Sequence, residues 1–94
     1  MKIVWSPRAI RHLEHLRAYV ERDLEQNAAL VAGRILKAVD LLQDHLQMGR
    51  PGRVLGTREL VIPDTPYIIP YRVRVDRLEL IAVFHGRQKW PLKM

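Results

Sequence analysis

The fold is decided by residues 67–85, which read YIIPYRVRVDRLELIAVFH. Apolar and polar residues alternate on both sides of Asp76-Arg77, as expected for antiparallel strands over residues 67–75 and 78–85 with those two residues as the loop. Pairing outward from the loop predicts one entirely apolar face, on which the facing pairs are Val75 with Leu78, Val73 with Leu80, Tyr71 with Ala82, and Ile69 with Phe84.

The other face of the predicted hairpin is mixed, with Arg74 across from Glu79, Arg72 across from Ile81, and Ile68 across from His85. Burial sets the register, because a fully buried apolar side chain contributes roughly 1.5–3 kcal/mol and a slip of one residue would expose the whole apolar set. Pro70 has no N–H for the ladder and prefers an edge or a bulge. We therefore expect the strand over residues 67–75 to be locally irregular.

The first half of the chain begins with a predicted strand and helix. Lys2–Trp5 is a short run of β-favouring residues that stops at Ser6. Ser6 is a suitable N-cap for a helix whose first residue is Pro7, where a missing N–H costs nothing. The helical spacing of apolar residues continues this helix to near Glu25.

A second helix is predicted from an N-cap at Asn27 to a stop at Met48-Gly49. Gly33 lies inside this helix and should cost about 1 kcal/mol relative to alanine; close packing of the two helices would explain it. The short connection between the helices predicts an antiparallel hairpin. One more strand is predicted at residues 58–62, ended by Pro63-Asp64-Thr65-Pro66.

Together these elements predict an α+β fold in the order β-α-α-β-β-β. The helical hairpin must bury its apolar stripe, and the apolar face of a small, mainly antiparallel sheet is the available surface. We expect residues 1–94 to form one domain.

The net charge of +6 is uneven, since residues 1–49 have a balance of +1 and residues 50–94 a balance of +5. The second half should attract an acidic partner, either nucleic acid or protein. The absence of cysteine excludes a disulfide framework and a thiolate metal site. His12 and His15 have no third ligand in view, so we expect two surface histidines, no metal site and no cofactor.

The sequence has no apolar run long enough to span a membrane, and its start lacks the apolar core of a secretory signal. We therefore expect a cytoplasmic protein with no membrane partner.

Four stretches resemble consecutive motifs of the RelE/ParE family of bacterial toxins, with ParE-type toxins closest: Trp5-Ser6-Pro7-Arg8-Ala9, Gly56–Val61, Tyr67–Val73 and Val83–Pro91. The resemblance spans nearly the whole chain. It implies a compact α+β toxin of a type II toxin–antitoxin system, acting in growth arrest and plasmid stabilisation. It also implies a cognate acidic antitoxin encoded nearby, which wraps the toxin with a segment that folds on binding. A homodimer and a hetero-oligomer with the antitoxin both remain open.

Two activities occur in this family. ParE-like toxins poison DNA gyrase without a known catalytic set, whereas RelE-like toxins cut messenger RNA on the ribosome. Where a RelE-like toxin would carry an arginine just after Tyr67, this chain has Ile68, and no tyrosine follows His85. We therefore favour a gyrase inhibitor, with a ribosome-dependent endoribonuclease as the alternative and a degenerate, antitoxin-bound toxin as a third hypothesis. For the nuclease, the candidate catalytic residues are His85, Arg58 and Arg87.

The candidate residues for binding the antitoxin or the target are basic, amide and aromatic: Arg58, Arg72, Arg74, Arg87, Gln88, Lys89 and Trp90. Arg72 and Arg74 share the mixed face with the apolar Ile68, Ile81 and Val83, which is typical of an interface; the alternative is a solvated face on which Glu79 pairs with Arg74.

Three residues each have a functional and a structural interpretation. Trp90 is either an anchor in a partner's pocket or stacked on a base, or it packs on the small core. His85 is either a general base or a structural or surface histidine. Glu59 is either a second base or a carboxylate paired with a neighbouring arginine, and we favour the pairing.

Overall fold

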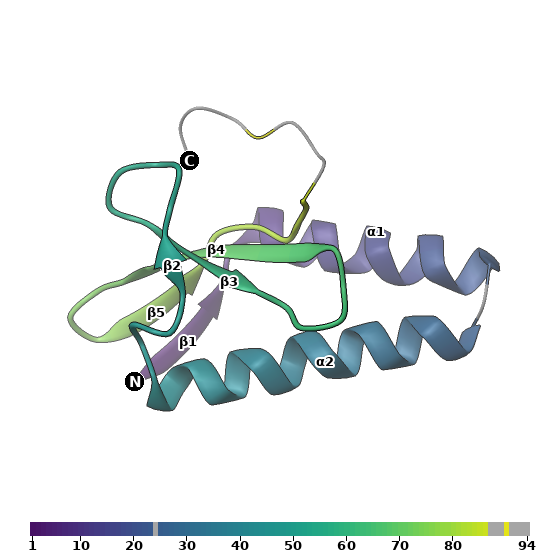
Figure 1. Ribbon diagram of the computed structural model, residues 1–94, viewed down its shortest axis with the longest axis horizontal. Helices are drawn as coiled ribbons and strands as arrows, with labels where there is room; N and C mark the ends of the chain where they lie inside the picture. Colours follow the sequence, from purple (N-terminus) through teal and green to yellow (C-terminus); the bar gives the residue numbers. More distant parts are fainter. Residues whose placement is uncertain (24, 87–89, 91–94) are drawn as a thin grey trace.

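The computed structural model describes residues 1–23, 25–86 and 90, with the backbone alone for residues within 17–29. Along this part of the chain a strand is followed by two helices and then by further strands (Figure 1). The elements are β1 (Lys2–Trp5), α1 (Pro7–Asp23), α2 (Glu25–Asp44), β2 (Arg50–Pro51), β3 (Arg58–Val61), β4 (Tyr67–Val73), β5 (Arg77–Leu80) and β6 (Phe84–His85). The predicted α+β order is confirmed, with the short strand β2 added and the strand predicted over residues 78–85 divided into β5 and β6. No helix within the described ranges has the length and apolar character needed to cross a membrane.

The strands form one mainly antiparallel sheet in the order β1-β5-β4-β3-β2, with β6 also paired to β4. Only β1 and β5 run parallel among the described pairs. The two helices lie side by side and antiparallel along one side of the sheet (Figure 1). The first strand of the chain therefore joins the C-terminal hairpin, and the helical hairpin spans the connection.

The start of α1 agrees with the sequence prediction, whereas both ends of α2 differ from it. Ser6 Oγ accepts a hydrogen bond from the Ala9 N–H at 3.0 Å, which confirms the predicted cap of α1. The predicted cap at Asn27 is wrong, because α2 already begins at Glu25 and Asn27 lies inside it. The α2 helix also ends before Met48, since the Met48 N–H turns back to the His45 carbonyl at 2.9 Å.

Gly33 does not mark a close approach of the two helices. It is exposed, and a Cβ built on it would meet nothing within 4 Å. The explanation of Gly33 by helix packing is therefore wrong.

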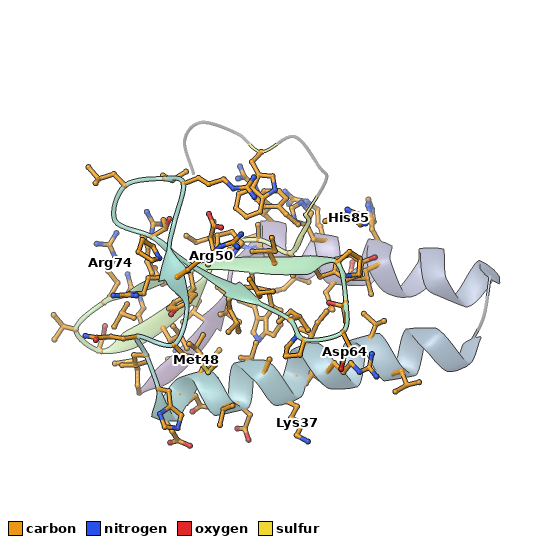
Figure 2. The ribbon with its side chains drawn as sticks, in the orientation of Figure 1. Lys37, Met48, Arg50, Asp64, Arg74 and His85 are labelled. Carbon is orange, nitrogen blue, oxygen red and sulfur yellow. The ribbon has the colours of Figure 1, made fainter. Side chains whose placement is uncertain are left out.

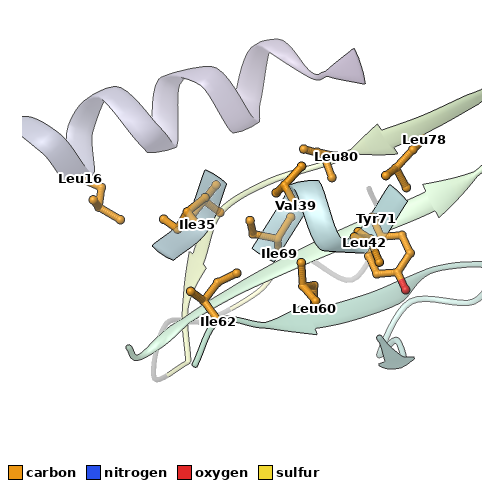
Figure 3. Close-up of a cluster of buried hydrophobic side chains, with 11 residues drawn as sticks. Leu16, Ile35, Val39, Leu42, Leu60, Ile62, Ile69, Tyr71, Leu78 and Leu80 are labelled. Carbon is orange, nitrogen blue, oxygen red and sulfur yellow. The ribbon is translucent and has the colours of Figure 1, made fainter. Parts of the chain in front are cut away.

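The main core lies between the helices and one face of the sheet (Figure 3). Leu16 of α1 and Ile35, Val39 and Leu42 of α2 pack against sheet residues of alternating position, which are Leu60, Ile69, Tyr71, Leu78 and Leu80. Leu80 and Tyr71 are fully buried. The sheet residues of this core face the helices, as the alternation of the hairpin predicts. Arg72 lies on the opposite face of the sheet, which the helices do not cover.

The register of the β4–β5 hairpin differs from the prediction by two residues. Tyr71 pairs with Leu80, and Val73 pairs with Leu78 rather than with Leu80. The Arg74 N–H donates to the Arg77 carbonyl at 2.8 Å, which closes the turn early and leaves Val75 fully exposed in the loop. Because side chains alternate with a period of two, this shift keeps every paired residue on its predicted face.

A second difference does change faces. The Ile81 N–H donates to the Pro70 carbonyl, so Ile81 lies opposite Pro70. Two residues earlier in β4, Ile68 pairs with Phe84, which is three residues after Ile81. The partner segment thus has one extra residue, which is a β-bulge. Phe84 and Ala82 leave the predicted apolar face for a second cluster with Ile81, whereas Val83 joins the main core.

The irregularity expected in the strand of Pro70 is found on the opposite strand, between Ile81 and Phe84. It also moves His85, which pairs with Tyr67 and not with Ile68.

Candidate functional site

Three arginines converge on Glu79, on the sheet face that the helices leave uncovered. The Nε atoms of Arg72, Arg74 and Arg77 lie 3.6, 3.3 and 3.1 Å from its carboxylate oxygens. Desolvation opposes ionisation of Glu79, but hydrogen bonds from Arg74 and Arg77 and the charges of Arg77 and Arg72 hold its pKa below the ordinary value. One carboxylate shared by three guanidinium groups leaves this cluster with a net positive charge.

Glu59 is a structural carboxylate of β3, opposite Pro70 in the middle of β4. It is 2% exposed and accepts hydrogen bonds from Arg50 Nε at 3.1 Å and from the Arg53 N–H at 2.8 Å. The expected pairing with a neighbouring arginine is confirmed. Arg58 also binds backbone, since its Nη1 donates to the Gly49 carbonyl at 2.7 Å.

Trp90 packs on the second cluster. Its ring centroid lies 4.7 Å from that of Phe84, and the Arg53 guanidinium lies 3.8 Å from the Trp90 ring centroid in a cation–π contact. Of the interpretations of Trp90, the structure shows the packing one, on this second cluster rather than on the main core. The other candidates of this segment, Arg87, Gln88 and Lys89, lie outside the described residues.

His85 and Arg58 are not brought together. His85 pairs with Tyr67, and the two rings meet edge-on at 5.7 Å, whereas Arg58 pairs with Tyr71. Tyr67 and Tyr71 are four residues apart on β4, which corresponds to roughly 13 Å along a strand. His85 also lies far from Arg74, towards the opposite end of the sheet (Figure 2). Of the three candidate nuclease residues, His85 and Arg58 therefore lie beside different parts of β4. Arg87 lies outside the described residues.

His12 is not the surface histidine that the sequence predicts. Its Nδ1 accepts a hydrogen bond from the Val83 N–H at 3.1 Å, and its ring lies 5.2 Å from that of Phe84. Burial, followed by the charges of Arg8, Arg11 and His15, lowers the pKa of His12. Within the described ranges no three His, Asp or Glu residues gather as metal ligands.

An apolar groove of about 620 Å³ between α2 and β3 has no counterpart in the sequence prediction. Leu41, Met48 and Val61 line it and are 51%, 42% and 47% exposed, with Arg34 and Lys37 also in its wall. Lys37 and Met48 can be followed in Figure 2, with Arg50 and Asp64 also in the lining. The sequence offers no signal for this groove, because Leu36 of the same helix is as exposed as Leu41 and does not line it.

Comparison with known proteins identifies the family. Residues 3–90 match the family model described as the ParE toxin of the type II toxin–antitoxin system, parDE. This chain belongs to the ParE toxin family. It is therefore the toxin component of a type II toxin–antitoxin system, and membership implies an antitoxin as its partner.

Two curated relatives and one solved structure resemble this ParE-family toxin. A candidate toxin named Y4kP from Sinorhizobium fredii is 49% identical over 90 residues, which are 96% of this chain and 93% of the relative. Toxin RelE2 of Caulobacter vibrioides is 27% identical over 85 residues, covering 90% and 94% of the two chains. The structure titled chromosomal ParDE TA system from P. aeruginosa has the same fold, with a TM-score of 0.83, 23% identity, and coverage of 90% of this chain and 95% of that chain.

Proposed function

We propose that this toxin arrests growth by inhibiting DNA gyrase and that its antitoxin neutralises it. The match of residues 3–90 to the ParE toxin family carries the proposal. The separation of Arg58 from His85 along β4 supports it, because cleavage of RNA needs a proton acceptor and phosphate-binding cations around the same phosphate. We further propose that the toxin acts in the cytoplasm, where gyrase works.

Purified toxin added to a gyrase supercoiling reaction tests this function. We expect supercoiling to stop or cleaved DNA to accumulate, and pre-incubation with the antitoxin to restore activity. A reaction unaffected by micromolar toxin would contradict the proposal.

A RelE-like ribosome-dependent endoribonuclease is the second candidate, favoured by the 27% identity to the protein named Toxin RelE2. Primer extension on translated messages after induction would then reveal new 5′ ends. Loss of those ends in His85→Ala would assign the cleavage to this chain and overturn gyrase inhibition as the primary activity. Induction without any growth defect would instead indicate a degenerate toxin.

We also propose that the groove between α2 and β3 binds the antitoxin. Its exposed apolar residues and the cations Arg34 and Lys37 fit an amphipathic segment with acidic residues, which is the charge expected of a partner for a chain of net charge +6. The basic residues of 87–89 remain proposed contacts of the same partner or of the target.

Two leucines of α2 give a matched test of the groove. Leu41 and Leu36 are 51% and 55% exposed, but only Leu41 lines the groove. We expect Leu41→Glu to weaken the complex with co-expressed antitoxin about tenfold or more, because it places a charge in an apolar contact. Leu36→Glu should leave the affinity unchanged, and equal effects of both variants would contradict a groove-specific contact.

A further inference from the structure

A second cavity, of about 480 Å³, opens where the start of α1 meets the uncovered face of the sheet. Its lining includes the apolar Val4 and Pro7 together with Arg8, Arg11, Arg72 and Glu79. Val4, Glu79 and Arg72 form one row across three neighbouring strands, since Glu79 pairs with both of the others. The cavity thus combines apolar groups with three guanidinium groups from two distant parts of the chain.

The arginines of this cavity are short of acceptors. The side chains of Arg8 and Arg11 form no hydrogen bond or ion pair with any residue that the structure describes. The buried Nε of Arg72 has no hydrogen-bond partner there either, because the nearest Glu79 oxygen is 3.6 Å away. Arg74 and Arg77 hold the same carboxylate more closely. Glu79 therefore cannot satisfy the cations around the cavity.

The stability of α1 does not explain the position of Arg8. The positive end of the helix dipole disfavours cations in the first turn, and that turn of α1 has no acidic residue. The Ala9 N–H is already satisfied by Ser6. Arg8 is thus placed against the electrostatic preference of its own helix, in a cavity wall that it shares with Arg11 and Arg72.

We propose that this cavity is a carboxylate-binding site for an acidic segment of the antitoxin. A glutamate or aspartate of the segment would accept charge-assisted hydrogen bonds from Arg8, Arg11 and Arg72, and an adjacent apolar side chain would cover Val4 and Pro7. A nucleic-acid backbone fits less well, because phosphates do not cover apolar groups and the lining has no aromatic side chain for a base. The inference rests on the antitoxin partner and is independent of gyrase.

The first test uses the free toxin and two probes, an N-acetylated, C-amidated peptide of alternating glutamate and leucine, and duplex DNA. Titration followed by calorimetry and by backbone amide resonances should show peptide binding with shifts at Arg8, Arg72 and Glu79. Arg8→Gln and Arg72→Gln should each weaken peptide binding about tenfold. Glu79→Gln should strengthen it, because the competing carboxylate is removed while the arginines remain.

Lys2→Gln is the matched control, since Lys2 is an exposed cation of β1 that does not line the cavity. The affinity of Lys2→Gln for the peptide should change less than the affinity of Arg8→Gln. Equal losses in both variants, no peptide binding, or weaker binding by Glu79→Gln would overturn the site. Binding of DNA with the same dependence on Arg8 and Arg72, and not of the peptide, would assign the cavity to nucleic acid and overturn the proposal.

The second test assigns the source of the carboxylate. In the complex of toxin and antitoxin, the amide resonances of Arg8 and Glu79 should shift as they do with the peptide, and Arg72→Gln should weaken the complex about tenfold. Unchanged resonances at both positions in the complex would refute the antitoxin as the occupant. Because gyrase takes no part in these measurements, their failure is distinct from a failure of gyrase inhibition.

Discussion

The Ser6 hydroxyl donates a hydrogen bond of 2.6 Å to the carbonyl oxygen of Ile81, which lies 75 positions away in the chain. In an antiparallel ladder the residue opposite Ile81 would return an N–H to that oxygen, but the opposite residue is Pro70. Ser6 therefore supplies the donor that a proline in the middle of the sheet lacks. The same hydroxyl oxygen accepts the Ala9 N–H, so one side chain caps α1 and completes the sheet.

Ser6→Ala should lower the free energy of unfolding by about 2–4 kcal/mol, because it removes a helix cap and leaves a buried carbonyl without a donor. Urea denaturation checks the loss. Pro70→Ala restores an N–H beside Ile81, so the cost of Ser6→Ala should be smaller in that background. Additive costs in the double-mutant cycle would show that Ser6 does not compensate for Pro70.

Gly33→Ala should stabilise the protein by about 0.5–1 kcal/mol. Glycine inside a helix costs conformational entropy relative to alanine, and the added Cβ would meet no atom within 4 Å. The midpoint of urea unfolding should rise without a change in slope. A fall in the midpoint would mean that Gly33 has a neighbour after all, as in a complex or a second copy of the chain.

Arg8→Glu should raise the free energy of unfolding by roughly 0.3–1 kcal/mol, since it places an anion at the positive end of α1 and relieves repulsion with Arg11. The same variant should lose binding to the acidic peptide described above. A more stable toxin with weaker binding is the combination expected if Arg8 is kept for a ligand. A variant that is both less stable and unchanged in binding would contradict that role.

His12 predicts a pH dependence of stability. Its Nδ1 accepts the Val83 N–H, and burial and nearby cations lower its pKa below 6.5, so the folded state binds this proton less readily than the unfolded chain. The contribution of neutral His12 is therefore complete above about pH 6.5 and is lost as the pH falls from there to the folded pKa. Stability should decline on acidification in that window.

Urea unfolding across this pH range, in the wild type and His12→Asn, measures the contribution. The asparagine can still accept the Val83 N–H but does not titrate, so part of the decline below pH 6.5 should disappear. His15→Asn changes an exposed histidine of the same helix and should keep the decline. A His12→Asn curve parallel to that of the wild type would contradict the assignment.

Much of the fold could be predicted from local signals. Ser6 and Pro7 mark the start of α1, and the alternation of residues 67–80 indicates which side chains face the helices, because burial favours one parity of the strand over the other. The C-terminal end of α2 is harder to predict, because the residues that follow it bond to the sheet, as the Gly49 N–H does to the Tyr71 hydroxyl.

The candidate site was harder to predict for the same reason. Arg72 and Arg74 are recognisable on the uncovered face, but Arg8 and Arg11 belong to a helix far away in sequence, and only the pairing of β1 with β5 brings them to Arg72. A first turn with a cation and no acidic residue was the available signal.

The sequence by itself determined the order of the elements, the cap of α1 and the parity of the hairpin, since each depends on neighbouring residues and on burial. The tertiary structure alone decided the register and the bulge. Shifts by two residues bury the same face, so the hydrogen bond between Arg74 and Arg77 makes the choice. The missing N–H of Pro70 lets the opposite strand gain a residue, and this turns Phe84 away from the core that alternation alone predicts for it.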